Sequence, residues 1–204
     1  MRLAAFFFAS LAVAVQAAPF KRDLGRNLVL HRVQELPADL PALDQARRQP
    51  AVLDMRYVRG DQAAAAAVQA WLRSHASART PVFVLANAET GSALVAHEDL
   101  AHVLVIGAAG RDFTPDIAVQ STPEDERRAY DALAAGADFS TLITENPTKI
   151  RNDEASLSRD RSTEPDTDPS ASGAAKEAAA SPPVDAALQR AVHLHRALLA
   201  LKKI

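Results

Sequence analysis

Two continuous apolar runs decide the fold of this chain: Pro81-Val82-Phe83-Val84-Leu85-Ala86 and His102-Val103-Leu104-Val105-Ile106-Gly107. Runs of this length, with proline at the first position alone, are typical of parallel strands that are buried on both faces. The sequence between them predicts a short helix from about Ser92 to Leu100. Strand, helix and strand together require a crossover on one face of a parallel sheet.

The same pattern occurs upstream of the first run. Residues 51–57 predict a strand, and Asp61 is a suitable cap for a helix from Gln62 to about Ala78. A further strand is expected over residues 27–33. The helix has one apolar face, at the spacing i, i+3, i+4 and i+7: Val68, Trp71, Leu72 and His75. The chain therefore predicts a single α/β domain over residues 18–150, with a parallel sheet and crossover helices.

Three segments follow the apolar runs. Thr122 and Pro123 are typical of a helix N-cap and first position, and this helix is expected to close near Gly136. Residues 151–183 are rich in Ser, Asp, Glu, Pro and Ala, which predicts a disordered linker. Residues 184–204 predict an amphipathic helix. This helix either docks on its own domain, the simpler interpretation, or binds another chain and supports oligomerisation.

The start of the chain has the features of a secretion signal. Arg2 precedes an apolar stretch from Leu3 to Val15, and Val15-Gln16-Ala17 has small residues where a signal peptidase reads them. We expect residues 1–17 to be removed, which makes the protein secreted or periplasmic. The alternative is an uncleaved N-terminal membrane anchor, for which the apolar stretch is short.

Composition argues against several classes of site. Cleavage would remove one basic residue and no acidic one, which leaves 22 Lys and Arg against 25 Asp and Glu and a net charge of −3. That balance argues against binding to nucleic acid or to an anionic membrane. The chain has no cysteine, so it forms neither disulfides nor thiolate metal sites. It has no phosphate-binding or dinucleotide-binding motif and no zinc-type spacing, so we expect no metal and no cofactor.

Three motifs carry a resemblance to a known family. Asp54-Met55-Arg56-Tyr57-Val58-Arg59-Gly60-Asp61 closes one predicted strand, Ser92 follows the next strand, and Pro115-Asp116-Ile117 follows the third. This order resembles that of the tail-specific (C-terminal processing) serine peptidases and extends over about residues 27–150. The resemblance implies a crotonase-like α/β fold.

The resemblance also implies roles for individual residues. Ser92 has the position of the catalytic nucleophile, just after a buried strand and at the start of a helix. Asp99 falls where the family carries an aspartate. Asp54, Arg56 and Gly60 match the family's Asp-Leu-Arg-x-Asn-x-Gly-Gly motif, which implies that Arg56 and Gly60 belong to the oxyanion site and the cleft.

The chain departs from the family where catalysis needs a base. Val58 and Asp61 replace the asparagine and the second glycine of the motif, and the loop with the family's catalytic lysine is missing. No lysine lies between Lys21 and Lys149, and a serine hydroxyl without a base is a poor nucleophile. We expect a degenerate, truncated and non-catalytic member. It would bind an extended peptide or a partner protein in the cleft that corresponds to the family's active site. Ser92 would then be the N-cap of its helix.

Two other functions stay open on the sequence alone. The first is an active serine-type endopeptidase, in which His102 or Lys149 is the base for Ser92. The second is an assembly protein, which acts through the acidic linker and the helix over residues 184–204. Peptide cleavage that depends on Ser92 would identify the first, and a loss of assembly on deletion of the C-terminal segments would identify the second.

Overall fold

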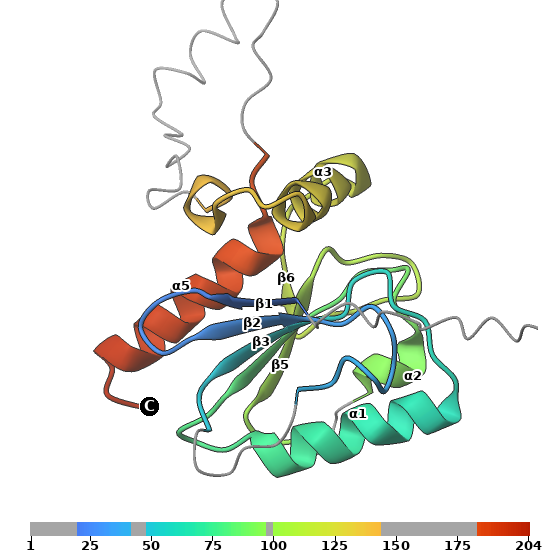
Figure 1. Ribbon diagram of the computed structural model, residues 1–204, viewed down its shortest axis with the longest axis horizontal. Helices are drawn as coiled ribbons and strands as arrows, with labels where there is room; N and C mark the ends of the chain where they lie inside the picture. Colours follow the sequence, from blue (N-terminus) through green and yellow to red (C-terminus); the bar gives the residue numbers. More distant parts are fainter. Residues whose placement is uncertain (1–19, 42–47, 97–99, 144–182) are drawn as a thin grey trace, which may run out of the picture.

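A six-stranded sheet of mostly parallel strands lies at the centre of the molecule (Figure 1). The computed structural model describes residues 20–41, 48–96, 100–143 and 183–204. The strands, which lie in the sheet in the order of the sequence, are β1 (Phe20–Asp23), β2 (Val29–Arg32), β3 (Ala51–Asp54), β4 (Val82–Leu85), β5 (Val103–Gly107) and β6 (Ile117–Ala118). Strands β2 to β6 are parallel, and β1 pairs antiparallel with β2 at one edge. A single α/β domain with a mostly parallel sheet is thereby confirmed.

Helices cover both faces of this sheet (Figure 1). They are α1 (Gln62–His75), α2 (Ser92–Val95), α3 (Pro123–Ala134), the 3₁₀ turn η2 (Phe139–Thr141) and α5 (Ala186–Ala200). Asp61 caps α1 by accepting a hydrogen bond from the Ala64 N–H, and Thr122 caps α3 by accepting one from the Asp125 N–H. Both caps have the residue that the sequence indicated.

The two apolar runs form the central strands. All four residues of β4 are buried, and β4 pairs in parallel with β3 on one side and with β5 on the other. Successive side chains alternate between the faces, as they must in a strand. Val82 and Val84 belong to one apolar cluster, whereas Phe83 and Leu85 belong to the other.

The order of the strands explains where the helices lie. Each parallel connection moves one place in the same direction across the sheet, and right-handed crossovers in one direction all lie on one face. Accordingly, α1 and α2 share a face, where Val68, Leu72 and Leu94 pack in one apolar cluster. The opposite face receives no crossover. It is covered by α5, with Leu188 and Val192 buried, and by Leu133 of α3.

The structure differs from the sequence-based expectations in one additional strand and in where a strand and a helix end. Strand β1 was not foreseen, because its Phe-Lys-Arg-Asp sequence lacks an apolar pattern. The strand expected over residues 51–57 ends at Asp54, since Val58 N donates to Met55 O in a tight turn and Tyr57 has a φ of 66°. Helix α1 ends at His75 rather than near Ala78.

Several expectations fall outside the described residues. They concern the signal sequence over residues 1–17, the linker over residues 151–182, Asp99 and Lys149. Within the described ranges, no helix combines the length and the apolar character that crossing a bilayer requires.

Candidate functional site

Two loops meet where β3 and β4 end, at the carboxyl edge of the sheet. We call the segments 57–60 and 87–92 the paired loops. The Gly91 N–H donates a hydrogen bond of 3.0 Å to the Val58 carbonyl oxygen, and the Thr90 hydroxyl donates one of 3.1 Å to the Met55 carbonyl oxygen. These two bonds tie the loop after β4 to the loop after β3. The carboxyl edge of a parallel sheet is also where open α/β folds bind their ligands.

Gly60 lies close to Gly91, the residue before Ser92, in the paired loops. The backbone nitrogen of Gly60 lies 3.7 Å from the position that a Cβ on Gly91 would occupy. A Cβ on Gly60 itself would lie 2.9 Å from Ala64 Cβ and 3.1 Å from Leu94 Cδ2. A side chain at position 60 would therefore crowd Ala64 of α1 and Leu94 of α2, which favours glycine there.

Ser92 is the first residue of α2, and its side chain is exposed. The expectation that it caps the helix is wrong, because the N-cap is Gly91 and no side chain accepts a capping hydrogen bond there. Within the described ranges, no residue forms a hydrogen bond with the Ser92 hydroxyl. Among the described residues, the exposed serine therefore has neither a side-chain hydrogen bond nor a neighbouring base.

The described candidate base lies at the other end of the sheet. The His102 carbonyl oxygen accepts a hydrogen bond of 3.0 Å from the Val82 N–H, at the amino end of β4. Ser92 instead follows the carboxyl end of the same strand. The length of the strand thus separates the two residues, and His102 is not placed to take a proton from Ser92.

Arg56 belongs to a buried ionic cluster and does not line a cleft, which corrects its expected place. Its Nη2 lies 2.8 Å from Asp54 Oδ2 and 2.9 Å from Asp185 Oδ2, and its Nη1 donates to Asp185 Oδ1 at 3.1 Å. Arg56 and Asp54 are completely buried. With two carboxylates engaged and no access to solvent, this guanidinium is not available to a ligand.

The cluster joins the sheet to the last helix. Asp185 is the N-cap of α5, accepting a hydrogen bond from the Leu188 N–H as well as the two from Arg56. On the other side of the cluster, Arg32 Nε donates to Asp54 Oδ2 at 3.3 Å. Burial by itself would raise the pKa of Asp54, but the guanidinium groups of Arg56 and Arg32 hold that pKa below its ordinary value.

Arg32 and two tyrosines extend this cluster toward α3. The Arg32 guanidinium lies 3.7 Å from the centre of the Tyr130 ring and donates from Nη1 to the Tyr130 carbonyl oxygen. Among the described residues, its Nη2 has no hydrogen-bond partner. The Tyr57 and Tyr130 rings meet edge to face at 5.0 Å. Burial, and next the Glu126 carboxyl group, raise the pKa of Tyr57 to about 12.

A second group at the paired loops was missed by the sequence analysis. Asn87 Nδ2 donates a hydrogen bond of 3.2 Å to Glu126 Oε1, although the two residues lie far apart in the sequence. Both side chains are buried, and Glu126 is 9% exposed. The available signal was weak: Asn87 directly follows a buried strand, and Glu126 is one of three acidic residues in the first turn of α3.

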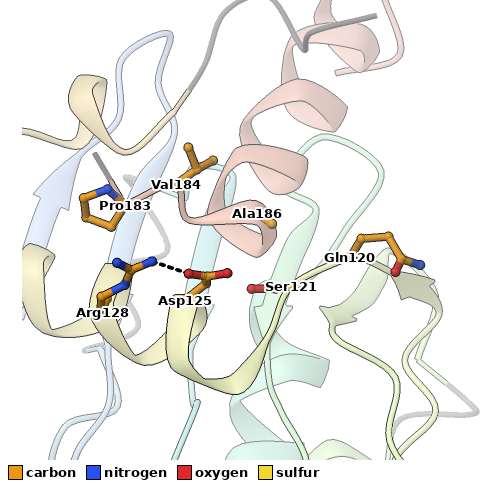
Figure 2. A pocket seen from close by; sticks show the side chains of 7 residues that line it. All are labelled: Gln120, Ser121, Asp125, Arg128, Pro183, Val184 and Ala186. Atoms are coloured by element: carbon orange, nitrogen blue, oxygen red, sulfur yellow. Dashed lines mark hydrogen bonds and ion pairs between the residues drawn. The ribbon is translucent and has the colours of Figure 1, made fainter. Parts of the chain in front are cut away.

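A separate groove of about 270 Å³ lies between the beginnings of α3 and α5 (Figure 2). It is lined by Gln120, Ser121, Asp125, Arg128, Pro183, Val184 and Ala186. One wall is polar, where Arg128 pairs with Asp125, and the opposite wall is apolar, where Val184 is 36% exposed. None of the predicted site residues lines this groove.

The described residues include no group of three or more His, Asp or Glu side chains that would hold a metal ion. Comparison of the chain with models of protein families, with curated proteins and with solved structures gives no match.

Proposed function

We propose that the chain is a secreted or periplasmic relative of the tail-specific serine peptidases that binds an extended peptide, or an extended segment of a partner protein, without cleaving it. The paired loops are the binding site. The proposal includes a crotonase-like ancestry for the sheet. It is supported by the order of the Asp54–Asp61, Ser92 and Pro115–Ile117 motifs, and the apolar stretch before Ala18 supports export.

The observation that carries the proposal is that Ser92 is exposed and that His102 is not placed to accept its proton. The Ser92 side chain is exposed, and Ser92 follows Gly91, which lies close to Gly60 at the carboxyl edge, while His102 belongs to the opposite edge of the sheet. A serine becomes a useful nucleophile when a neighbouring base accepts its proton. Without such a base, the hydroxyl still donates and accepts hydrogen bonds, which suits binding to a peptide backbone.

An active endopeptidase is the second candidate, and the exposure of Ser92 favours it. In that function the base would be Lys149, which lies outside the described residues. The assembly function receives less support, because the apolar face of α5 is covered by its own sheet, with Leu188 fully buried.

Cleavage of an unstructured fluorogenic peptide mixture separates the first two candidates. Purified protein over residues 18–204 should show no turnover, and neither should its Ser92→Ala variant. Ser140→Ala is the matched control, because Ser140 is exposed and distant in sequence. Turnover that survives in Ser140→Ala and disappears in Ser92→Ala would contradict the proposal and establish a peptidase.

Binding is measured by fluorescence anisotropy with a labelled mixture of unstructured peptides. A bulky side chain at exposed Ser92 should block the site without unfolding the domain, so Ser92→Trp should weaken binding about tenfold or more, as loss of a central contact does. Ser140→Trp should bind like the wild type. No binding at millimolar peptide, or equal binding by both variants, would reject the proposed site.

A further inference from the structure

Asn87 is the centre of the hydrogen bonds that shape the paired loops. Its side-chain oxygen Oδ1 accepts hydrogen bonds from the Tyr57 N–H at 3.4 Å, from the Glu89 N–H at 3.1 Å and from the Thr90 hydroxyl at 3.2 Å, whose single proton is shared with the Met55 carbonyl oxygen. The first of these donors belongs to the loop after β3 and the other two to the loop after β4. The orientation of this amide side chain therefore contributes to how the two loops meet, beside the bonds from Gly91 to Val58 and from Thr90 to Met55.

Glu126 holds that amide in place from outside the loops. With Oδ1 facing the loops, Asn87 Nδ2 points toward α3 and donates to Glu126 Oε1 at 3.2 Å. Among the described residues, Asn87 is the hydrogen-bond partner of this carboxyl group. A flipped Asn87 would lose the acceptor toward Tyr57 and would aim its oxygen at a carboxylate, so Glu126 selects one orientation.

The position of Glu126 is unfavourable for the fold itself. Burial raises its pKa, Arg56 and the Asn87 hydrogen bond act in the opposite direction, and Asp185 and Asp54 raise the pKa further. The net effect of the folded structure is to disfavour the ionised form. A carboxyl group held where its ionised form is disfavoured, beside a loop junction, is typical of a functional position.

We infer that Glu126 is a positioning residue for the binding site: through Asn87 it fixes the relative placement of the two loops that present Gly60 and Ser92. The inference rests on the proposed function for its purpose, but the arrangement of the loops can be tested without any ligand. Glu126 does not touch the ligand in this scheme, and its effect passes through a single amide.

Amide hydrogen exchange followed by NMR tests the placement directly. In Glu126→Ala, the Gly91 and Thr90 amides should exchange about tenfold faster than in the wild type, because loss of a hydrogen bond to a charged group lowers the free energy of local opening. Amides of β4 and α1 should not change. Glu126→Gln keeps an oxygen for Asn87 Nδ2, so exchange should return to within about threefold of the wild type.

Glu124→Ala is the matched control, because Glu124 lies in the same helical turn and is exposed. Alanine is a strong helix former, so neither alanine variant should unfold α3. If the Gly91 and Thr90 amides exchange at the wild-type rate in Glu126→Ala, the positioning role is wrong. Uniform acceleration over all strands would also overturn it, since it would show a general role in stability.

A binding measurement separates failure of the inference from failure of the proposed function. With the labelled peptide mixture, Glu126→Ala should bind about tenfold more weakly, and Glu126→Gln should bind nearly as the wild type does. Loosened loops with no peptide binding by any form would retain the positioning role and reject the proposed function. Wild-type binding by Glu126→Ala, together with loosened loops, would show that the loop arrangement has no part in recognition and would overturn the inference.

Discussion

The two faces of the sheet are covered by sequence of two different kinds. On one face lie α1 and α2, which directly follow β3 and β4 and are the crossovers of the parallel sheet. On the other lies α5, which begins at Ala186, far along the chain from every strand. Strand order dictates the first covering, whereas the second must be held by specific contacts. Those contacts include a buried ionic cluster in which Arg56 binds both Asp54 and Asp185.

Removing the cation of the ionic cluster, which helps to hold α5 on its face of the sheet, should give the largest loss of stability. Arg56→Ala would leave Asp185 buried without its cation and Asp54 with Arg32 alone, which should lower the free energy of unfolding by about 3–5 kcal/mol. Urea denaturation followed by circular dichroism measures this change. Arg59→Ala, three residues further along the chain and exposed, should cost less than about 0.5 kcal/mol.

Asp185→Asn isolates the ionic part of that effect. Asparagine caps a helix about as well as aspartate does, so the start of α5 should keep its hydrogen bond to the Leu188 N–H. Stability should nevertheless fall, because Arg56 loses one of its two carboxylate partners. If Arg56→Ala and Asp185→Asn both unfolded like the wild type, α5 would not depend on the cluster.

Replacing one buried leucine on each face by alanine compares how much the two apolar cores contribute to the free energy of unfolding. Leu72→Ala on α1 and Leu188→Ala on α5 each remove a buried leucine, so each should destabilise the protein by about 2–5 kcal/mol. Trp71, the single tryptophan of the chain, belongs to the cluster on the α1 face. Its fluorescence therefore reports unfolding on the face that α5 does not touch.

For Leu188→Ala, the midpoints from Trp71 fluorescence and from circular dichroism should shift together, since one sheet supports both cores. A circular dichroism transition that shifts while the Trp71 transition stays in place would show that α5 detaches independently. The two faces would then be separate cooperative units rather than halves of one domain.

Acid gives a smaller effect that is specific to the α5 face. His195 on α5 is 1% exposed, and among the described residues its Nε2 has no hydrogen-bond partner. Burial lowers the pKa of His195, with smaller contributions from Arg26 and Arg196. The unfolded chain therefore takes up this proton more readily than the folded one, so its contribution to stability is complete above about pH 6.5 and decreases as the pH falls toward the folded pKa.

His195→Leu should remove this part of the pH dependence. Between pH 7 and pH 5, the melting temperature of the variant should decrease less than that of the wild type, as thermal denaturation would show. His193→Leu, on the same helix, is the control. His31, whose pKa is lowered to about 4, and His75 remain in every form, so the difference between curves is the informative quantity. Parallel curves for wild type and His195→Leu would contradict the prediction.

Local pattern was sufficient for the central strands and for the two helix caps. The apolar runs at β4 and β5 are suited to strands that are covered on both faces. Asp61 and Thr122 cap helices that begin at the next residue, so a short stretch of sequence is enough to predict them. Pattern failed where the chain turns. The sequence alternates through Tyr57, but the strand ends at Asp54, and the chain then turns at Tyr57, whose φ is 66°.

The candidate site was predictable in part, for the same reason. The motifs that contain Gly60 and Ser92 lie in adjacent loops, with Gly60 close to Gly91. The place of Arg56 was not predictable, because its partner Asp185 is an ordinary N-cap residue in the sequence. The hydrogen bond between Asn87 and Glu126 joins a loop to a later helix, and no sequence pattern around either residue predicts the other as its partner.

Local pattern was enough to predict a parallel α/β sheet with crossover helices and the caps of α1 and α3. These properties follow from hydrophobic period and chirality, which act over short distances along the chain. The tertiary structure alone decided which segment covers the second face, which carboxylates neutralise Arg56 and which helix steadies the paired loops. Those contacts form between residues that are distant in sequence, so no local pattern predicts them and they arise only when the whole chain has folded.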